Sequence, residues 1–404
     1  MKSSIKIIEN GSISSPKGFK SGAIFAGIKT PGEDKKDIGI LFSDEPCTVA
    51  GTYSQNSILS PSVTLTKERV NSKRKIRGLV ANSGCANCSV GEQGYLDAKE
   101  TTNITAKFLN VDEEEILVAS TGIIGIELPM ALMREYIPKI SISNDYGKEF
   151  AKSILTTDKK TKEIALVIEL GDQRVNLAGV AKGSGMIHPN MATMLAFITT
   201  DAKIEKELLQ KILSEAIKKS FNQTDVDGDQ STNDTVLIFA NGKSGVNIDH
   251  KDISNVFSEA VTKICQYLAK EIAKDGEGAS KLIEVTVEGA KSDNDALLAS
   301  RSVASSLLVR TAVYGRDPNW GRILMAVGKT GIDLEESKID LYINEIQIAS
   351  EGKAIAYNVQ SVITALGKEE VSIKVSLNIG SGYGQAWGSD LTEEYVIFNS
   401  AYTT

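Results

Sequence analysis

Strand-like and helix-like runs follow one another along this chain without a regular order. Strict alternation of the two would predict a doubly wound parallel sheet, but here several strands occur in succession before and after the helices. The order therefore predicts a mixed α/β fold of layered sandwiches. The strand-like runs are 116–120, 165–170 and 174–180 (a hairpin), 194–198, 236–240, 283–287, 341–348 and 371–379, and the helical runs are 204–217 and 256–272.

After the second helical run, near Glu277 and Gly278, the helical spacing of apolar residues gives way to the alternation that is typical of strands. A chain of 404 residues is long enough for more than one domain. We expect residues 1–278 to form an α/β core and residues 279–404 to form a smaller α+β domain.

Composition restricts the partners of this protein. The chain has 45 basic and 52 acidic residues and a net charge of −7, which argues against nucleic acid or an anionic membrane as the main partner. No run approaches the roughly 20 apolar residues of a membrane span. The first residues lack the apolar core of a signal peptide, and four cysteines are too few for a disulfide framework. These features predict a cytoplasmic location.

A threonine stands where a glycine- and proline-punctuated loop, 182–190, meets an apolar strand-like run. The hydroxyl of Thr193 at this junction can attack the carbonyl of Ala192 and split the chain. Cleavage would give Thr193 a free α-amine with a pKa of about 7.7–8.0, which suits proton transfer at neutral pH. A threonine that opens a strand is the ordinary alternative. We predict that Thr193 is a self-generated nucleophile.

The buried strand at 116–120 ends in Thr121 and Gly122. A hydroxyl and a backbone N–H at such a point can form an oxyanion hole, although an ordinary turn has the same sequence. His188 could act as a base, but the adjacent Pro189 favours a structural or substrate-shaping role. His250 lies in a polar stretch and is expected to be exposed.

Several short segments resemble metal-binding or cofactor-binding motifs but lack residues or elements that these motifs require. The run 225–229 resembles a calcium loop, but glutamine and valine occupy the positions that need glycine and glutamate. Cys85 and Cys88 have C-x-x-C spacing without a second ligand pair, so we expect unpaired thiols. The glycines at 380–384 follow a strand, but no helical pattern follows them. Neither a metal nor a cofactor is predicted.

Taken together, the segments resemble the ornithine acetyltransferase (glutamate N-acetyltransferase) family of arginine biosynthesis, and the resemblance spans essentially the whole chain. The strongest element is 182–195. The chain departs from the family pattern at Cys85, where asparagine is common. The supporting segments are 120–122, 156–158, 227–229, 231–235, 275–278, 315–322 and 399–404.

The resemblance implies an aminopeptidase-like fold and self-cleavage between Ala192 and Thr193, with the α fragment 1–192 and the β fragment 193–404 assembled as a heterotetramer of two of each. It implies acetyl transfer from N2-acetylornithine to glutamate by a ping-pong mechanism through acetyl-Thr193. Whether acetyl-CoA also serves as a donor stays open from the sequence. We expect the C-terminal tail to return to the active site. The implied oxyanion hole is Thr121 and Gly122, and the implied substrate contacts are Thr156, Lys182, Thr193, Glu277, Asn399 and Thr404.

Chemistry agrees with this assignment. Both substrates carry an α-carboxylate, for which Lys182 is a suitable partner, and Glu277 can bind the ornithine ammonium. Two alternatives stay open from the sequence. A self-cleaving amidase or aminopeptidase would use the same threonine but admit water, and an uncleaved amino-acid-binding protein would show no processing.

Overall fold

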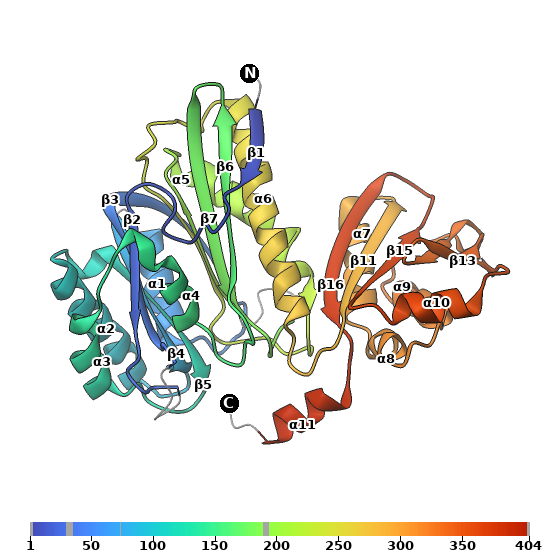
Figure 1. Ribbon diagram of the computed structural model, residues 1–404, viewed down its shortest axis with the longest axis horizontal. Coiled ribbons are helices and arrows are strands. Elements are labelled where there is room, and N and C mark those ends of the chain that lie inside the picture. Colours follow the sequence, from blue (N-terminus) through green and yellow to red (C-terminus); the bar gives the residue numbers. More distant parts are fainter. Residues whose placement is uncertain (1–2, 30–34, 73, 189–193, 402–404) are drawn as a thin grey trace.

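A computed structural model describes the chain except residues 1–2, 30–34, 73, 189–193 and 402–404 (Figure 1). The larger of its two sheets has nine strands in the order β1-β6-β7-β8-β10-β3-β4-β5, and β2 pairs with β3. Most pairs are antiparallel, but β4 with β5 and β8 with β10 are parallel. The strands are β1 (Ser3–Ile7), β2 (Phe19–Ile24), β3 (Ile38–Tyr53), β4 (Ile76–Cys85), β5 (Ile116–Ile123), β6 (Lys162–Leu170), β7 (Gln173–Lys182), β8 (Leu195–Thr200) and β10 (Thr235–Ala240).

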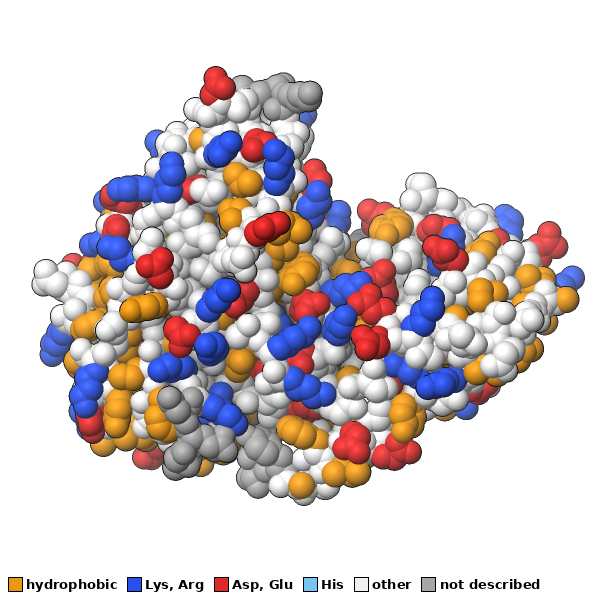
Figure 2. Space-filling model, in the orientation of Figure 1, with side chains coloured by type: hydrophobic (Ala, Val, Ile, Leu, Met, Phe, Trp, Pro, Cys, Tyr) orange, Lys and Arg blue, Asp and Glu red, His pale blue; other side chains and the backbone are white. Residues whose placement is uncertain are grey.

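The second sheet has seven strands in the order β14-β13-β12-β15-β11-β16-β9 and is also mixed. Figure 1 shows it beside the larger sheet, and Figure 2 shows a notch between the two lobes. The strands are β9 (Thr224–Asp225), β11 (Leu282–Ala290), β12 (Asp340–Ile343), β13 (Ile346–Ser350), β14 (Lys353–Ala354), β15 (Glu370–Ser376) and β16 (Gly382–Ser389).

Helices cover both sheets. Around the larger sheet lie α1 (Pro61–Asn71), α2 (Gln93–Leu109), α3 (Met130–Tyr136), α4 (Gly147–Ser153), α5 (Lys206–Lys218) and α6 (Lys251–Lys274). With the second sheet lie α7 (Asp293–Ala304), α8 (Leu307–Gly315), α9 (Trp320–Gly328) and α10 (Val359–Leu366), and α11 (Glu393–Ala401) follows the last strand.

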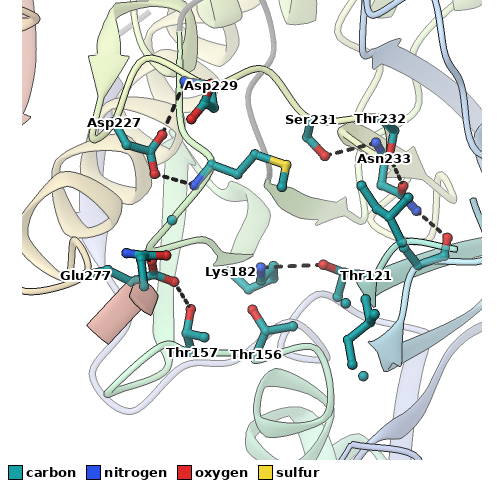
Figure 3. A pocket seen from close by; sticks show the side chains of 18 of the residues that line it. Thr121, Thr156, Thr157, Lys182, Asp227, Asp229, Ser231, Thr232, Asn233 and Glu277 are labelled. Carbon is teal, nitrogen blue, oxygen red and sulfur yellow. Dashed lines mark hydrogen bonds between the residues drawn. The ribbon is translucent and has the colours of Figure 1, made fainter. Parts of the chain in front are cut away.

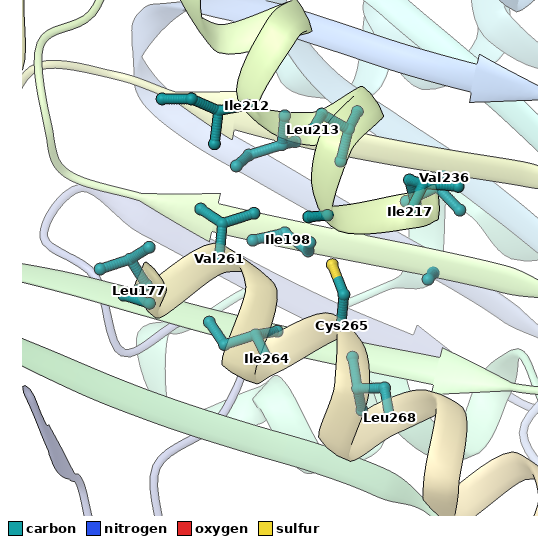
Figure 4. Packing of buried hydrophobic residues seen from close by; sticks show 14 of the residues in the cluster. Leu177, Ile198, Ile212, Leu213, Ile217, Val236, Val261, Ile264, Cys265 and Leu268 are labelled. Atoms are coloured by element: carbon teal, nitrogen blue, oxygen red, sulfur yellow. The ribbon is translucent and has the colours of Figure 1, made fainter. Parts of the chain in front are cut away.

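The core of the larger sheet forms where α5 and α6 pack on it. In α6 the buried residues Val261, Ile264 and Leu268 recur at helical spacing and face the strands (Figure 4). Every residue of β8 and of β10 is buried, as expected for strands covered on both faces. Helix α6 also contacts β9, β11 and β16, so it joins the two sheets.

The predicted mixed α/β class is confirmed, as are the hairpin β6–β7, the buried strands β8 and β10, and helices α5 and α6. The prediction of strand structure across 341–348 needs correction. The structure has two strands there, β12 and β13, because the backbone turns at Asn344 and Glu345, where both φ angles are positive.

The predicted division at residue 278 stays a prediction. The second sheet is built mainly from residues after 278, but β9 comes from before it and pairs with β16. Among the described residues no single helix is long and apolar enough to cross a membrane, although the bent pair α7–α8 meets the length and composition when the two are taken together.

Candidate active site

A cavity of about 400 Å³ lies where the ends of β5 and β7 meet the loops around 156, 185 and 230 (Figure 3). Its volume falls within the roughly 300–1,000 Å³ of small-molecule sites. Its lining residues are Lys29, Gly84, Ala86, Thr121, Gly122, Ile123, Ile124, Thr156, Thr157, Lys182, Gly185, Met186, Asp227, Asp229, Gln230, Ser231, Thr232, Asn233, Glu277, Tyr395 and Asn399.

Six of the residues predicted for the site line this one cavity, although they are spread over nearly 280 positions of the sequence. They are Thr121, Gly122, Thr156, Lys182, Glu277 and Asn399. Three further predicted residues, Ala192, Thr193 and Thr404, lie outside the described residues.

The chain near the predicted nucleophile is fixed on its C-terminal side. Met194, the next residue, donates its backbone N–H to Asp234 Oδ1 at 2.8 Å. Leu195 then opens β8 and pairs with Lys182 of β7, which lines the cavity. Asp234 is fully buried, and this burial raises its pKa well above the usual range. A buried carboxyl group therefore holds Met194 at the start of β8, beside the cavity.

Lys182 is a buried cation of the cavity. Its Nζ lies 3.5 Å from Thr121 Oγ1 and can donate to it. No carboxylate forms an ion pair with Lys182 among the described residues, and its burial lowers the pKa of the ammonium. An ammonium in this setting is suited to a carboxylate or a developing oxyanion in a bound ligand.

Behind Lys182 lies a buried ion cluster formed by Lys162, Asp158 and Asp275. Lys162 Nζ donates to Asp158 Oδ1 and to Asp275 Oδ2, at 2.6 Å in each case. Burial opposes the charge on Lys162, but the two carboxylates outweigh it and raise the pKa of this lysine. Asp158 also accepts the backbone N–H groups of Thr156 and Gly183, at 3.1 and 2.7 Å. The cluster thus holds two loops of the cavity.

Glu277 joins the tail of the chain to the cavity. Its Oε1 accepts from Thr157 Oγ1 at 2.6 Å, and its Oε2 accepts from Asn399 Nδ2 of α11 at 3.1 Å. A Cβ at Gly185 would lie 2.4 Å from this carboxylate, so a side chain there would displace the Glu277 carboxylate from its present position. The carboxylate lies on the same side of the cavity as Asp227, away from Thr121 (Figure 3).

Backbone packing determines the end of β5. Gly122 has a φ of +134°, and a Cβ there would lie 2.3 Å from the backbone of Gly84. Asn233 Nδ2 donates to the carbonyls of Ala86 and Ser120, at 2.7 and 2.8 Å, and so ties this strand end to the neighbouring loop. Thr121 and Gly122 are thereby held rigidly at the cavity wall, as an oxyanion hole requires.

Asp227 shapes the loop that leads to the predicted cleavage site. Its two carboxylate oxygens accept the backbone N–H groups of Met186 and Ile187, at 2.6 and 2.8 Å. Met186 has a φ of +56°, which is unusual for a residue with a side chain. Burial raises the pKa of Asp227 to about 6. The carboxylate of Asp227, in the run 225–229, therefore fixes the backbone at Met186 and Ile187.

Comparison with known proteins identifies the family. The ArgJ family profile matches residues 20–404. The chain belongs to the ArgJ family. It is 47% identical to the arginine biosynthesis bifunctional protein ArgJ of Dehalococcoides mccartyi, over the whole of both chains, and 46% identical to that of Lactococcus lactis, over 98% of this chain and 99% of the relative. A crystal structure of ArgJ from Bacillus halodurans, 42% identical, covers 51% of this chain and 98% of its own with a TM-score of 0.49. The family predicted from the sequence is confirmed.

Outside the cavity lining, His188 of this ArgJ family member lies with its Nδ1 2.7 Å from Asp225 Oδ2. The buried Arg310 contacts the same carboxylate at 3.9 Å and donates to the Ser389 carbonyl of β16. These contacts agree with a structural role for His188. His250 is exposed, and Cys85 and Cys88 are buried free thiols.

Lys29 and Tyr395 are among the cavity residues that sequence reasoning did not predict for the site. Lys29 precedes the segment 30–34 and carries no motif, and Tyr395 lies on α11, which has no buried residue and therefore no apolar periodicity to predict it. The only sequence signal for Tyr395 is its closeness to the terminal segment 399–404.

Proposed function

We propose that this chain is a self-processing glutamate N-acetyltransferase of arginine biosynthesis, which transfers acetyl from N2-acetyl-L-ornithine to L-glutamate. The observation that carries the proposal is the identity of 47% to a relative named for arginine biosynthesis, over the full length of both chains. The cavity adds independent support, because it combines the ammonium of Lys182, which has no ion pair among the described residues, with carboxylates and a rigid strand end in one small space.

Self-cleavage between Ala192 and Thr193 is the first step of the proposal. The Thr193 hydroxyl attacks the Ala192 carbonyl, the peptide bond becomes an ester, and water releases fragment 1–192 from fragment 193–404. The new α-amine of Thr193 then serves as the base. The contact of Asp234 with the Met194 amide supports this step, because it fixes the residue that follows the nucleophile.

In the transfer, the Thr193 hydroxyl attacks the acetyl carbonyl, and the bond from that carbonyl to the α-nitrogen of ornithine breaks. The hydroxyl proton passes through the Thr193 amine to the leaving nitrogen. The amine of glutamate later attacks the acetyl ester, the bond from the acetyl carbonyl to the Thr193 oxygen breaks, and a proton from the attacking amine returns through the Thr193 amine to that oxygen. Thr121 and Gly122 stabilise the oxyanion. Lys182 binds the α-carboxylate shared by both substrates, and Glu277 binds the ornithine ammonium.

Thr156, Asn399 and Thr404 complete the proposed substrate contacts. We place the catalytic core at 1–278 and the smaller domain at 279–404, with the tail returning to the site. The bond from Asn399 to Glu277 supports this return. A cytoplasmic heterotetramer of two α and two β fragments, and acetyl-CoA as a second donor, complete the proposal. The word bifunctional in the relatives' names supports the second donor.

Two measurements test the proposed function. On a denaturing gel the active protein should give two bands, and the second fragment should begin at Thr193, whereas Thr193→Ala should give one band and no turnover. With N2-acetylornithine as donor, continuous ornithine release should require glutamate. Rapid release without glutamate would indicate an amidase or aminopeptidase, and a single band from active protein would falsify self-processing.

A further inference from the structure

The proposed reaction sets a recognition problem for the cavity. N-acetylornithine and glutamate share an α-carboxylate, but the first has a side-chain ammonium and the second a side-chain carboxylate. One site that binds both in turn needs an acid for the first and a second cation for the second. Glu277 can provide the acid, and Lys182 is already assigned to the carboxylate that both substrates share. The inference that follows rests on this proposed function.

Among the described residues that line the cavity, Lys29 is the other cation besides Lys182. Its position is fixed by backbone contacts. The buried Asp37 carboxylate accepts the N–H groups of Ala26 and Ile28, both at 2.7 Å, and curls the segment that ends at Lys29. The Lys29 backbone then rests on Gly84, where a Cβ would lie 2.6 Å from the Lys29 Cα. Since Gly84 packs in turn against Gly122, Lys29 is held next to the proposed oxyanion hole.

The ammonium of Lys29 has capacity for a ligand. Its Nζ donates to the Leu155 carbonyl at 2.6 Å, which occupies one of three N–H donors. Within the described part of the chain, no carboxylate forms an ion pair with Lys29 or with Lys182. Lys162, the buried lysine behind the cavity, is bound to Asp158 and Asp275. The cavity therefore presents two ammonium groups that lack carboxylate partners there, the number that a dicarboxylic ligand needs.

We propose that Lys29 binds the side-chain carboxylate of the acceptor and so makes the enzyme select glutamate over a neutral amino acid of the same shape. Lys29 touches only the acceptor in this scheme. The donor has no second carboxylate, so acetylation of the enzyme by N-acetylornithine does not depend on Lys29.

The test compares L-glutamate with L-glutamine as acceptors for the processed enzyme. Replacing an ammonium that binds a carboxylate should cost at least about tenfold in affinity. In Lys29→Gln the ratio of kcat/KM for glutamate to that for glutamine should fall at least about tenfold, mainly through KM for glutamate. Ornithine release in the first turnover should change by less than about threefold. Lys29→Arg, which keeps the charge, should retain the preference for glutamate.

Lys159→Gln is the matched control, because it removes one charge from an exposed lysine in a neighbouring loop and should leave the ratio unchanged. An unchanged ratio in Lys29→Gln would overturn the role of Lys29. Should that variant not fold, reductive methylation of the wild-type enzyme gives a second test. Glutamate, but not glutamine, should slow modification of Lys29 several-fold, and equal protection would overturn the proposal. If the wild-type enzyme shows no glutamate-dependent ornithine release, the proposed function itself fails.

Discussion

The ion cluster behind the cavity and the cavity itself each contain one buried lysine, on adjacent strands. Lys162 of β6 pairs in register with Ala181, the residue before Lys182 of β7. Lys162 has two carboxylates at 2.6 Å, and its pKa is raised. Lys182 has no such ion pair within the described residues, and burial lowers its pKa. The two lysines are both buried, but their pKa values shift in opposite directions because, in the described part of the chain, only Lys162 has carboxylates in contact.

This difference separates a structural charge from a charge available to a ligand. A buried ion with its counter-ions in place is satisfied within the fold, whereas an ammonium without one pays for desolvation until an anion binds. The comparison predicts that replacing the two lysines will have opposite consequences, with stability lost in one case and activity in the other.

The largest effect is expected from Lys162→Met, because it leaves the buried carboxylates of Asp158 and Asp275 without their shared cation. Removing one partner of a buried ion pair costs about 3–5 kcal/mol. We expect a loss of this size in the free energy of unfolding, measured by urea on the uncleaved Thr193→Ala background. An unchanged transition would show that the cluster is not a structural element.

Lys182→Met is expected to have the converse effect. It removes a cation that has no described ion-pair partner, so the free energy of unfolding should change by less than about 1 kcal/mol on the same background. In the processed enzyme kcat/KM should fall about 100-fold, equivalent to about 2.7 kcal/mol of barrier. Lys159→Met, at an exposed site, serves as the control for both measurements. A loss of stability equal to that of Lys162→Met would remove the distinction between the two lysines.

Glu277→Gln tests the acid that faces these cations. Glutamine can keep contacts to Thr157 and Asn399 but loses the charge that the proposal assigns to the ornithine ammonium. KM for N-acetylornithine should rise about tenfold, while KM for glutamate should change less. Glu394→Gln, on the exposed surface of α11, is the control. Equal changes in both KM values would argue against a charge-specific role for Glu277.

The sequence predicts elements whose periodicity reports their burial. Helix α6 and strands β8 and β10 were predictable because each buries a continuous stripe or both faces. The turn at Asn344 and Glu345 was not, because it lacks the glycine that marks most tight hairpins and interrupts an otherwise alternating run.

The residues of the candidate site also differ in how far the sequence predicts them. Local sequence context pointed to Thr193, Thr121 and Gly122, whereas the other residues predicted for the site came from the family resemblance, since no local pattern links Thr121 to Asn399. The cluster of Lys162 with Asp275 joins residues 113 positions apart, and periodicity contains no information on such a pair. Lys29 is placed by the packing of one backbone on Gly84, a contact that only the folded chain displays.

The smallest expected effect concerns Asp227. Its carboxylate accepts backbone N–H groups and, in the part of the chain that the structure describes, has no lysine in an ion pair, unlike the carboxylates around Lys162. Burial raises its pKa from the ordinary 3.8 to about 6, with Asp225 adding to the shift. Between these values the folded chain holds a proton that the unfolded chain lacks. The contribution of Asp227 to the free energy of unfolding is therefore fully present below the ordinary pKa and is lost as pH rises through about 6.

Wild type should accordingly lose about 1 kcal/mol relative to Asp227→Asn between pH 5 and pH 7, since asparagine does not titrate. Urea unfolding of both proteins at these two values, on the uncleaved background, measures the difference. Arg310 and Tyr395 also interact with this carboxylate and stay in place in both proteins, so their contributions cancel to first order. A stability difference that is constant with pH would show that Asp227 is already ionised at pH 5. Neutral Asp227 would then have no part in holding Met186 and Ile187 at that pH.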